Sequence, residues 1–129
     1  MIKEIGIVGD FHNSKTQVAI ANSIDHSNRL LGLSTKYRWI DTMVLAENNY
    51  CEELKMLSGI WSASGSPFKS IQGSLNAIKY ARKNNIPHIG TCGGYQHTII
   101  EYARNVLGIE NANHAEYKEG FDNLIIDKM

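Results

Sequence analysis

The octapeptide GTCGGYQH, Gly90 to His97, joins a short apolar run to a long helical pattern through a cysteine flanked by glycines. Its first residues match G-x-nucleophile-x-G, with cysteine at the nucleophile position. The pattern predicts a sharp turn from a strand into a helix, where small residues are needed because the backbones crowd together. We therefore interpret Cys92 as a candidate nucleophile on an elbow. The helix dipole favours its thiolate, and backbone N–H groups there can stabilise an oxyanion.

Two other interpretations of Cys92 stay open on the residues alone. A free cysteine is most often a small buried hydrophobe. His88 and His97 stand near Cys92 at spacings close to those of zinc ligands. The strand–turn–helix pattern spreads these three over different elements, however, and the sequence holds no C-x-x-C pair. We expect no metal site and no cofactor, and we interpret Cys51 as an incidental residue of a polar helix.

Apolar runs alternate with helical patterns on both sides of the elbow, and the loops between them are short. Strands are expected over residues 4–8, 37–40, 59–63 and 86–91, with a fifth over 123–127. Helices are expected after an S-x-x-Q capping box at Ser14, over 50–57, from 71 to about 84, and from 95 to 108. This alternation favours an α/β fold, a three-layer, doubly wound, mostly parallel sheet of flavodoxin-like type. Because ligands bind at the carboxyl ends of such strands, we expect the site in loops 9–13, 62–70 and 91–94.

The composition indicates one globular domain, residues 1–129, with a single core. Thirteen basic and thirteen acidic residues cancel, so we expect no nucleic-acid partner. The apolar run in MIKEIGIVGD is too short for a signal peptide, and no run approaches the ~18 apolar residues that a membrane span needs. Two cysteines are too few for a disulfide framework. We therefore expect a cytoplasmic protein with reduced thiols and no membrane contact.

Two longer segments carry a family resemblance: ASGSPFKS, residues 63–70, and CGGYQHTIIEYARNVLG, residues 92–108. They resemble the class I glutamine amidotransferase domain of CTP synthase. They are similar, almost position for position, to a stand-alone family related to the C-terminal region of that enzyme. The resemblance runs from Ile5 to about Tyr117 and is most specific after Gly59. It implies the fold of class I glutamine amidotransferases.

The resemblance also implies roles for individual residues. In these domains a cysteine attacks the side-chain amide of glutamine, forms a glutamyl thioester and releases ammonia, which is the role implied for Cys92. Gly65 and Gly93 match the two donors of the oxyanion hole. Gln96 and Glu116 match positions that hold the substrate glutamine, with Glu116 at its α-ammonium group. The physical chemistry agrees in kind, because a carboxylate suits an ammonium and backbone N–H groups suit an oxyanion.

Three features depart from the family pattern. The loop reads ASGSP instead of PGGFG, so Ser66 replaces the aromatic residue that contacts glutamine and becomes a substrate-binding candidate. The cysteine is followed by GGY instead of LGM. The family's base, a histidine that works with a glutamate in a C-terminal segment, has no counterpart before Met129. We therefore expect a truncated domain whose general base is unknown.

The histidines of the chain are the candidates to replace that base. His114, in the segment NHAEY beside the expected glutamine site, is the better candidate. His12 follows the first strand, at the correct end of the sheet, but is equally well explained as a solvated side chain. His97 is expected to point along its helix, and His26 and His88 to be surface or packing residues.

Two main hypotheses of function follow, with a third beside them. The first is a glutaminase-type domain that hydrolyses glutamine or a related amide and supplies ammonia to a synthetase partner. Because no G-x-x-x-x-G-K-[ST] motif for ATP occurs, the chain is not expected to make CTP alone. The second is an inactive binding or assembly module of the same fold, whose uncovered sheet edge and helix face predict a homo-oligomer. The third is a small-anion binder that uses the SGSP loop and a helix N-terminus.

Overall fold

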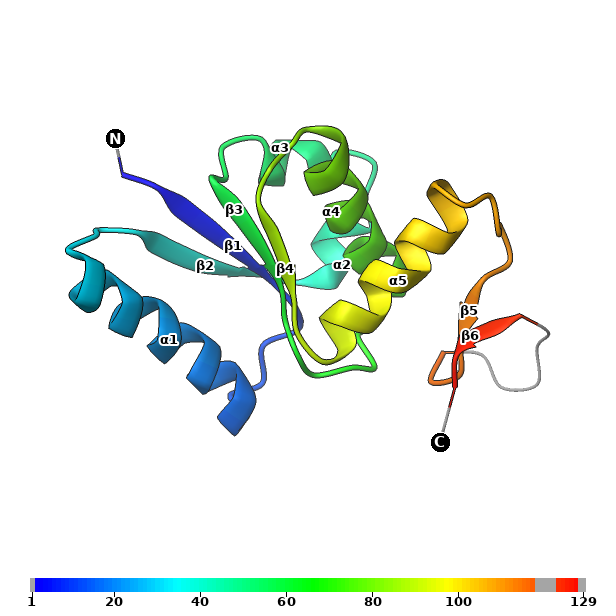
Figure 1. Ribbon diagram of the computed structural model, residues 1–129, viewed down its shortest axis with the longest axis horizontal. Helices are drawn as coiled ribbons and strands as arrows, with labels where there is room; N and C mark the ends of the chain where they lie inside the picture. Colours follow the sequence, from blue (N-terminus) through cyan, green and yellow to red (C-terminus); the bar gives the residue numbers. More distant parts are fainter. Residues whose placement is uncertain (1, 118–122, 128–129) are drawn as a thin grey trace.

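A computed structural model describes residues 2–117 and 123–127 of the chain. Its centre is a four-stranded parallel sheet in the order β2-β1-β3-β4 (Figure 1). The strands are β1 (Glu4–Val8), β2 (Lys36–Ile40), β3 (Gly59–Ser62) and β4 (His88–Gly90). The predicted parallel α/β sheet is confirmed, with β4 shorter than expected. Pro87 has no N–H to donate to a neighbouring strand, although its carbonyl accepts from Ile60 N at 2.9 Å.

In the described part of the chain, five helices connect or follow these strands. They are α1 (Lys15–Leu31), α2 (Thr42–Leu45), α3 (Tyr50–Leu54), α4 (Ile71–Lys83) and α5 (Gly93–Asn105). The predicted capping box at Ser14 is present, with Gln17 N donating to Ser14 Oγ at 3.3 Å. The sequence did not predict α2, which Asp41 caps by accepting from Met43 N at 2.8 Å. A helix of four residues is too short to show an apolar period.

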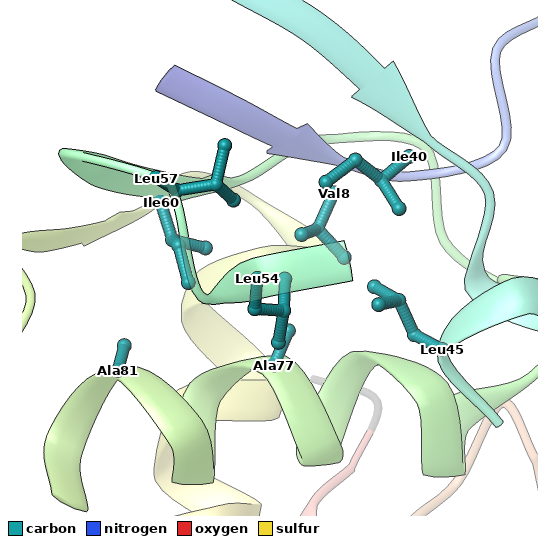
Figure 2. Close-up of a cluster of buried hydrophobic side chains, with 8 residues drawn as sticks. All are labelled: Val8, Ile40, Leu45, Leu54, Leu57, Ile60, Ala77 and Ala81. Carbon is teal, nitrogen blue, oxygen red and sulfur yellow. The ribbon is translucent and has the colours of Figure 1, made fainter. Parts of the chain in front are cut away.

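The helices form two layers around the sheet, as a doubly wound fold requires. Figure 1 shows α1 on one side of the sheet and α2, α3, α4 and α5 on the other. On the α1 side, Ile20 and Ile24 pack with Ile7 and Ala63. On the other side, a buried cluster joins the sheet to α2, α3 and α4 (Figure 2); its members are Val8, Ile40, Leu45, Leu54, Leu57, Ile60, Ala77 and Ala81. Burial of each large aliphatic side chain there contributes roughly 1.5–3 kcal/mol.

The carboxyl-terminal part differs from the sequence prediction in two ways. The fifth strand forms as β6 (Leu124–Ile126), but it pairs with β5 (Asn113–His114) in a separate two-stranded sheet, beyond α5 in Figure 1. Arg104 holds this region to α5, because its guanidinium donates to Ala112 O at 2.7 Å and to Asn113 Oδ1 at 3.0 Å. The helix ends at Asn105, before the predicted stop at Gly108, whose φ of 72° lets Ile109 N donate back to Ala103 O.

None of the helices in residues 2–117 and 123–127 has the length and apolar character needed to cross a membrane.

The closest contact between α2 and α4 yields a stability prediction. A Cβ at Gly73 would lie 1.8 Å from the carbonyl oxygen of Thr42. Gly73→Ala should therefore lower the free energy of unfolding by about 3 kcal/mol or more, because two helix backbones must separate. Chemical denaturation measures the change. The matched control is Gly59→Ala, whose Cβ would have no neighbour closer than 3.6 Å; equal losses in both variants would contradict this account.

Candidate functional site

The predicted turn at Cys92 is present between β4 and α5. Cys92 is the N-cap residue of α5, with φ 52° and ψ −119°. Few non-glycine residues adopt a positive φ, and such outliers cluster at functional sites. The side chain is exposed. The structure thus presents a thiol on a strained turn at the carboxyl edge of the parallel sheet.

The glycines around Cys92 are required by close backbone contact. A Cβ at Gly94 would lie 2.0 Å from the carbonyl oxygen of Ser62, and one at Gly90 would lie 2.8 Å from the carbonyl oxygen of Gly94. Gly94 N also donates to Ala63 O at 3.1 Å. The elbow is therefore pressed against the end of β3, where larger side chains have no room.

The loop after β3 lies directly against the elbow. A Cβ at Gly93 would lie 2.6 Å from Ser66 Cβ. Gly65 has φ 114°, and the bond between Ser66 and Pro67 is cis. The structure thus brings together the loop residues Gly65 and Ser66 and the elbow residues Cys92 and Gly93, which the sequence placed 26 to 28 positions apart.

Asp10, which the sequence analysis did not single out, anchors this loop. Its carboxylate accepts from Thr42 N at 2.9 Å, from Thr42 Oγ1 at 2.9 Å and from Lys69 N at 2.6 Å. Thr42 Oγ1 in turn accepts from Ser70 N at 3.0 Å. One carboxylate therefore ties the end of β1, the start of α2 and the loop before α4. Its position just after a buried strand was the signal in the sequence that could have identified Asp10 as a site residue, because the loops at the carboxyl ends of parallel strands form the site.

Gln17 fixes the neighbouring loop after β1. Its side chain is fully buried, accepts from His12 N at 2.9 Å and donates to Asp10 O at 3.1 Å. His12 Nδ1 lies 2.9 Å from the same carbonyl oxygen. The His12 ring is exposed, and its Cε1 would lie 3.4 Å from a Cβ at Gly65. His12 thus lies beside the Gly65 loop.

The substrate-binding candidates Gln96 and Glu116 meet at His114. His114 Nε2 lies 2.9 Å from Gln96 Oε1, and Glu116 N donates to His114 Nδ1 at 3.1 Å. The nearest Glu116 carboxylate oxygen lies 3.9 Å from His114 Nε2. Because the ring is only 3% exposed, burial lowers the pKa of His114 and favours the neutral form. Both ring nitrogens of the weak base candidate are therefore engaged within the fold.

A cluster of rings packs under these residues and connects them to the loop after β3. His97 contacts Phe68, His114 and Tyr117, with ring centroids 5.0, 5.9 and 5.4 Å apart. Phe68 N donates to Tyr117 Oη at 2.6 Å. Burial raises the pKa of Tyr117 to about 12, so its hydroxyl stays protonated. The segment around Glu116 is thereby attached to the loop that carries Gly65 and Ser66.

His97 and His88 have packing positions. His97 is fully buried, its Nδ1 lies 2.9 Å from Ser74 Oγ, and its Nε2 has no hydrogen-bond partner among the described residues. Burial, aided by the nearby His114, lowers the pKa of His97 to about 4. His88 Nε2 lies 2.9 Å from Ser62 Oγ. His26 is exposed on α1.

The alternative of a metal site gains no support from these positions. His88 lies on β4, Cys92 at the turn and His97 inside α5, as the sequence pattern implied. Across residues 2–117 and 123–127, no three His, Cys, Asp or Glu side chains are grouped as metal ligands would be. Cys51 is exposed on α3.

Comparisons with known proteins agree on one family. The family described as glutamine amidotransferase class-I matches residues 13–126. CTP synthase of Staphylococcus haemolyticus is 37% identical over 126 residues, and that of Staphylococcus saprophyticus is 34% identical. Each match covers 97% of this chain but 24% of the relative, so the chain spans about a quarter of the length of these relatives.

One solved structure is similar in fold as well as in sequence. It is the glutaminase domain of Trypanosoma brucei CTPS with bound acivicin, with a TM-score of 0.81 and 28% identity. The match covers 92% of this chain and 47% of that chain.

The burial of His97 yields a prediction of pH dependence. A histidine whose pKa is lowered on folding contributes stability above its unfolded pKa, about 6.5, and that stability is lost as the pH falls towards the folded value. Acidification from about pH 7.5 to about pH 5 should cost the parent about 2 kcal/mol more of its free energy of unfolding than it costs His97→Leu. Urea denaturation at each pH measures both. Equal losses would show that the ring is protonated in the folded state, contrary to this account.

Proposed function

This chain belongs to the class I glutamine amidotransferases, and on that premise we propose that it cleaves the side-chain amide of glutamine with Cys92 as the nucleophile. The supporting observation is the exposed thiol of Cys92 on a strained turn at the helix N-terminus, pressed against the loop of Gly65 and Ser66. A thiolate is favoured at the positive end of a helix dipole. The family's reaction needs this combination of nucleophile and adjacent backbone donors.

The proposed reaction has two steps. Cys92 Sγ adds to the carbonyl carbon of the side-chain amide, the C–N bond breaks, and the nitrogen leaves as ammonia with the proton of the thiol. Water then adds to the thioester, which yields glutamate and restores the thiol. Gly65 N and Gly93 N are the proposed donors to the oxyanion in both steps.

The proposed substrate contacts use the groups around His114. The Glu116 carboxylate is 41% exposed and suits the α-ammonium group of free glutamine. Gln96, one turn into α5, offers an amide on the same side of the His114 ring. Ser66 stands where the family pattern has an aromatic residue that contacts glutamine, so a small hydroxyl group would contact the substrate here.

The ammonia acceptor is proposed to be a synthetase. The relatives are CTP synthases of which this chain spans about a quarter. The sequence contains no P-loop for ATP. We therefore propose that another polypeptide region or subunit with synthetase chemistry uses the ammonia.

The competing proposal is a domain that binds glutamine without turnover. Burial lowers the pKa of His88, His97 and His114, which makes each of these rings a weaker acceptor for a proton from Cys92. Without a base from these three rings or from His12, which lies beside the Gly65 loop, catalysis would rest on the dipole and the oxyanion donors, which is a weaker combination.

Ammonia release from L-glutamine and covalent labelling by diazo-oxo-norleucine distinguish these two proposals. Cys92→Ala should lower ammonia release at least about a thousandfold and abolish the labelling, because the thioester can no longer form. Cys51→Ser is the matched control, since it removes the other exposed thiol and should leave both readouts unchanged. Absence of ammonia and of labelling in the parent would refute the catalytic proposal and favour binding without turnover.

We also propose that the chain self-associates through the α1 side of the sheet. Ile5, Trp61 and Ile89 line grooves there, and Ile89 on edge strand β4 is 51% exposed. Exposed apolar surface of this kind is typical of interfaces. We expect a second copy of this chain to cover these grooves, because its formal net charge of zero gives no electrostatic repulsion between copies.

Light scattering tests this proposal. The parent should have at least twice the mass of one chain, and Ile89→Lys should convert it to a monomer, because a charge in a desolvated contact is costly. The circular dichroism spectrum should stay the same. Tyr102→Lys, which places a charge on an exposed site of α5 instead, is the control and should keep the oligomer. A monomeric, well-folded parent would contradict the proposal.

A further inference from the structure

The protonation state of the His114 ring follows from its hydrogen bonds. Glu116 N–H is a donor that cannot accept, and it lies 3.1 Å from His114 Nδ1. Nδ1 therefore carries a lone pair and no proton. In a neutral ring the single proton must then lie on Nε2. Burial supports the neutral ring, because it lowers the pKa of His114.

The orientation of the Gln96 side chain follows in turn. His114 Nε2–H donates, so the Gln96 atom 2.9 Å away must be the acceptor, Oε1. The amide nitrogen of Gln96 then points away from His114. No group in the described part of the chain accepts from it, and Gln96 is partly exposed. Two N–H donors of Gln96 are thus available to a ligand.

We infer that His114 is a positioning residue that orients Gln96, so that its NH2 group, and not its oxygen, faces the α-carboxylate of an amino-acid ligand. This inference rests on the proposed function for the identity of the ligand. The Glu116 carboxylate lies on the same side, 3.9 Å from His114 Nε2. A donor and a carboxylate beside one ring nitrogen match the carboxylate and ammonium of a free amino acid. Without His114, the Gln96 amide is free to rotate and present its oxygen to the ligand, which repels a carboxylate.

The ring cluster holds His114 in this orientation. Tyr117 contacts the His114 ring with centroids 5.5 Å apart, and His97 contacts it from α5. These contacts fix the plane of the His114 ring. The hydrogen bond from Glu116 N to Nδ1 fixes Nε2 as the nitrogen that faces Gln96. Positioning by a buried ring costs little entropy when the ligand binds.

The test compares L-glutamine with L-glutaminamide, in which a neutral amide replaces the α-carboxylate. Calorimetry in a Cys92→Ala background gives dissociation constants without turnover. The Cys92→Ala protein should bind glutamine with a dissociation constant about tenfold or more lower than that of glutaminamide, because Gln96 donates to a charged group. His114→Leu should remove most of this preference, and His114→Gln should restore part of it by replacing the Nε2–H donor.

Phe68→Leu is the matched control for packing, because it removes a buried ring of the same cluster whose ring contact is with His97 and not with His114. It should keep the preference for glutamine. A preference that survives in His114→Leu, or that falls equally in Phe68→Leu, would overturn the inference. Failure of the Cys92→Ala protein to bind either compound would overturn it as well.

Two further readouts separate this inference from the proposed reaction. Long-range proton–nitrogen correlation spectra should show His114 with its proton on Nε2, and a proton on Nδ1 would overturn the inference whatever the activity. In chains with Cys92 intact, His114→Leu should raise KM about tenfold and leave kcat nearly unchanged. If the parent binds glutamine but releases no ammonia, the reaction fails while the binding comparison still decides the role of His114.

Discussion

The contact between Gly94 and the end of β3 is the constraint on which the candidate site depends. A Cβ at Gly94 would lie 2.0 Å from the carbonyl oxygen of Ser62, so only glycine fits there and α5 begins directly against the sheet. Cys92, just before this contact, has a positive φ of 52°. The same contact places Gly93 against Ser66. A strained turn survives only where surrounding packing determines it, and here the end of β3 supplies that packing.

The rest of the site is assembled by polar groups that bridge loops. The carboxylate of Asp10 binds the start of α2 and the loop after β3, while Gln17 holds the loop after β1. On the far side, Tyr117 joins the segment of Glu116 to Phe68. Because buried or half-buried hydrogen bonds are costly to lose, these contacts fix the relative positions of loops that have little secondary structure of their own.

The two buried histidines of the ring cluster make different contacts. His97 supplies a buried neutral ring to the cluster, whereas His114 uses both nitrogens to connect Glu116 with Gln96. Neither arrangement favours uptake of a thiol proton, because burial lowers the pKa of His97 to about 4 and both ring nitrogens of His114 are already hydrogen-bonded. Among the described residues, these contacts therefore identify no proton acceptor for Cys92.

The order of the main strands and helices and the turn at Cys92 could be predicted from the sequence, because apolar periods, caps and glycine spacing are local signals. The family could be predicted because residues 63–70 and 92–108 resemble it segment by segment. The sequence did not reveal β5, α2 or the pairing of β6, since very short elements carry no period and pairing depends on distant residues. Nor did it reveal the hydrogen bonds of Asp10, Gln17 and His114. These contacts come from the tertiary structure, because a hydrogen bond between loops depends on where the whole fold places each side chain. Asp10 and Thr42, for example, meet across 32 positions of the chain.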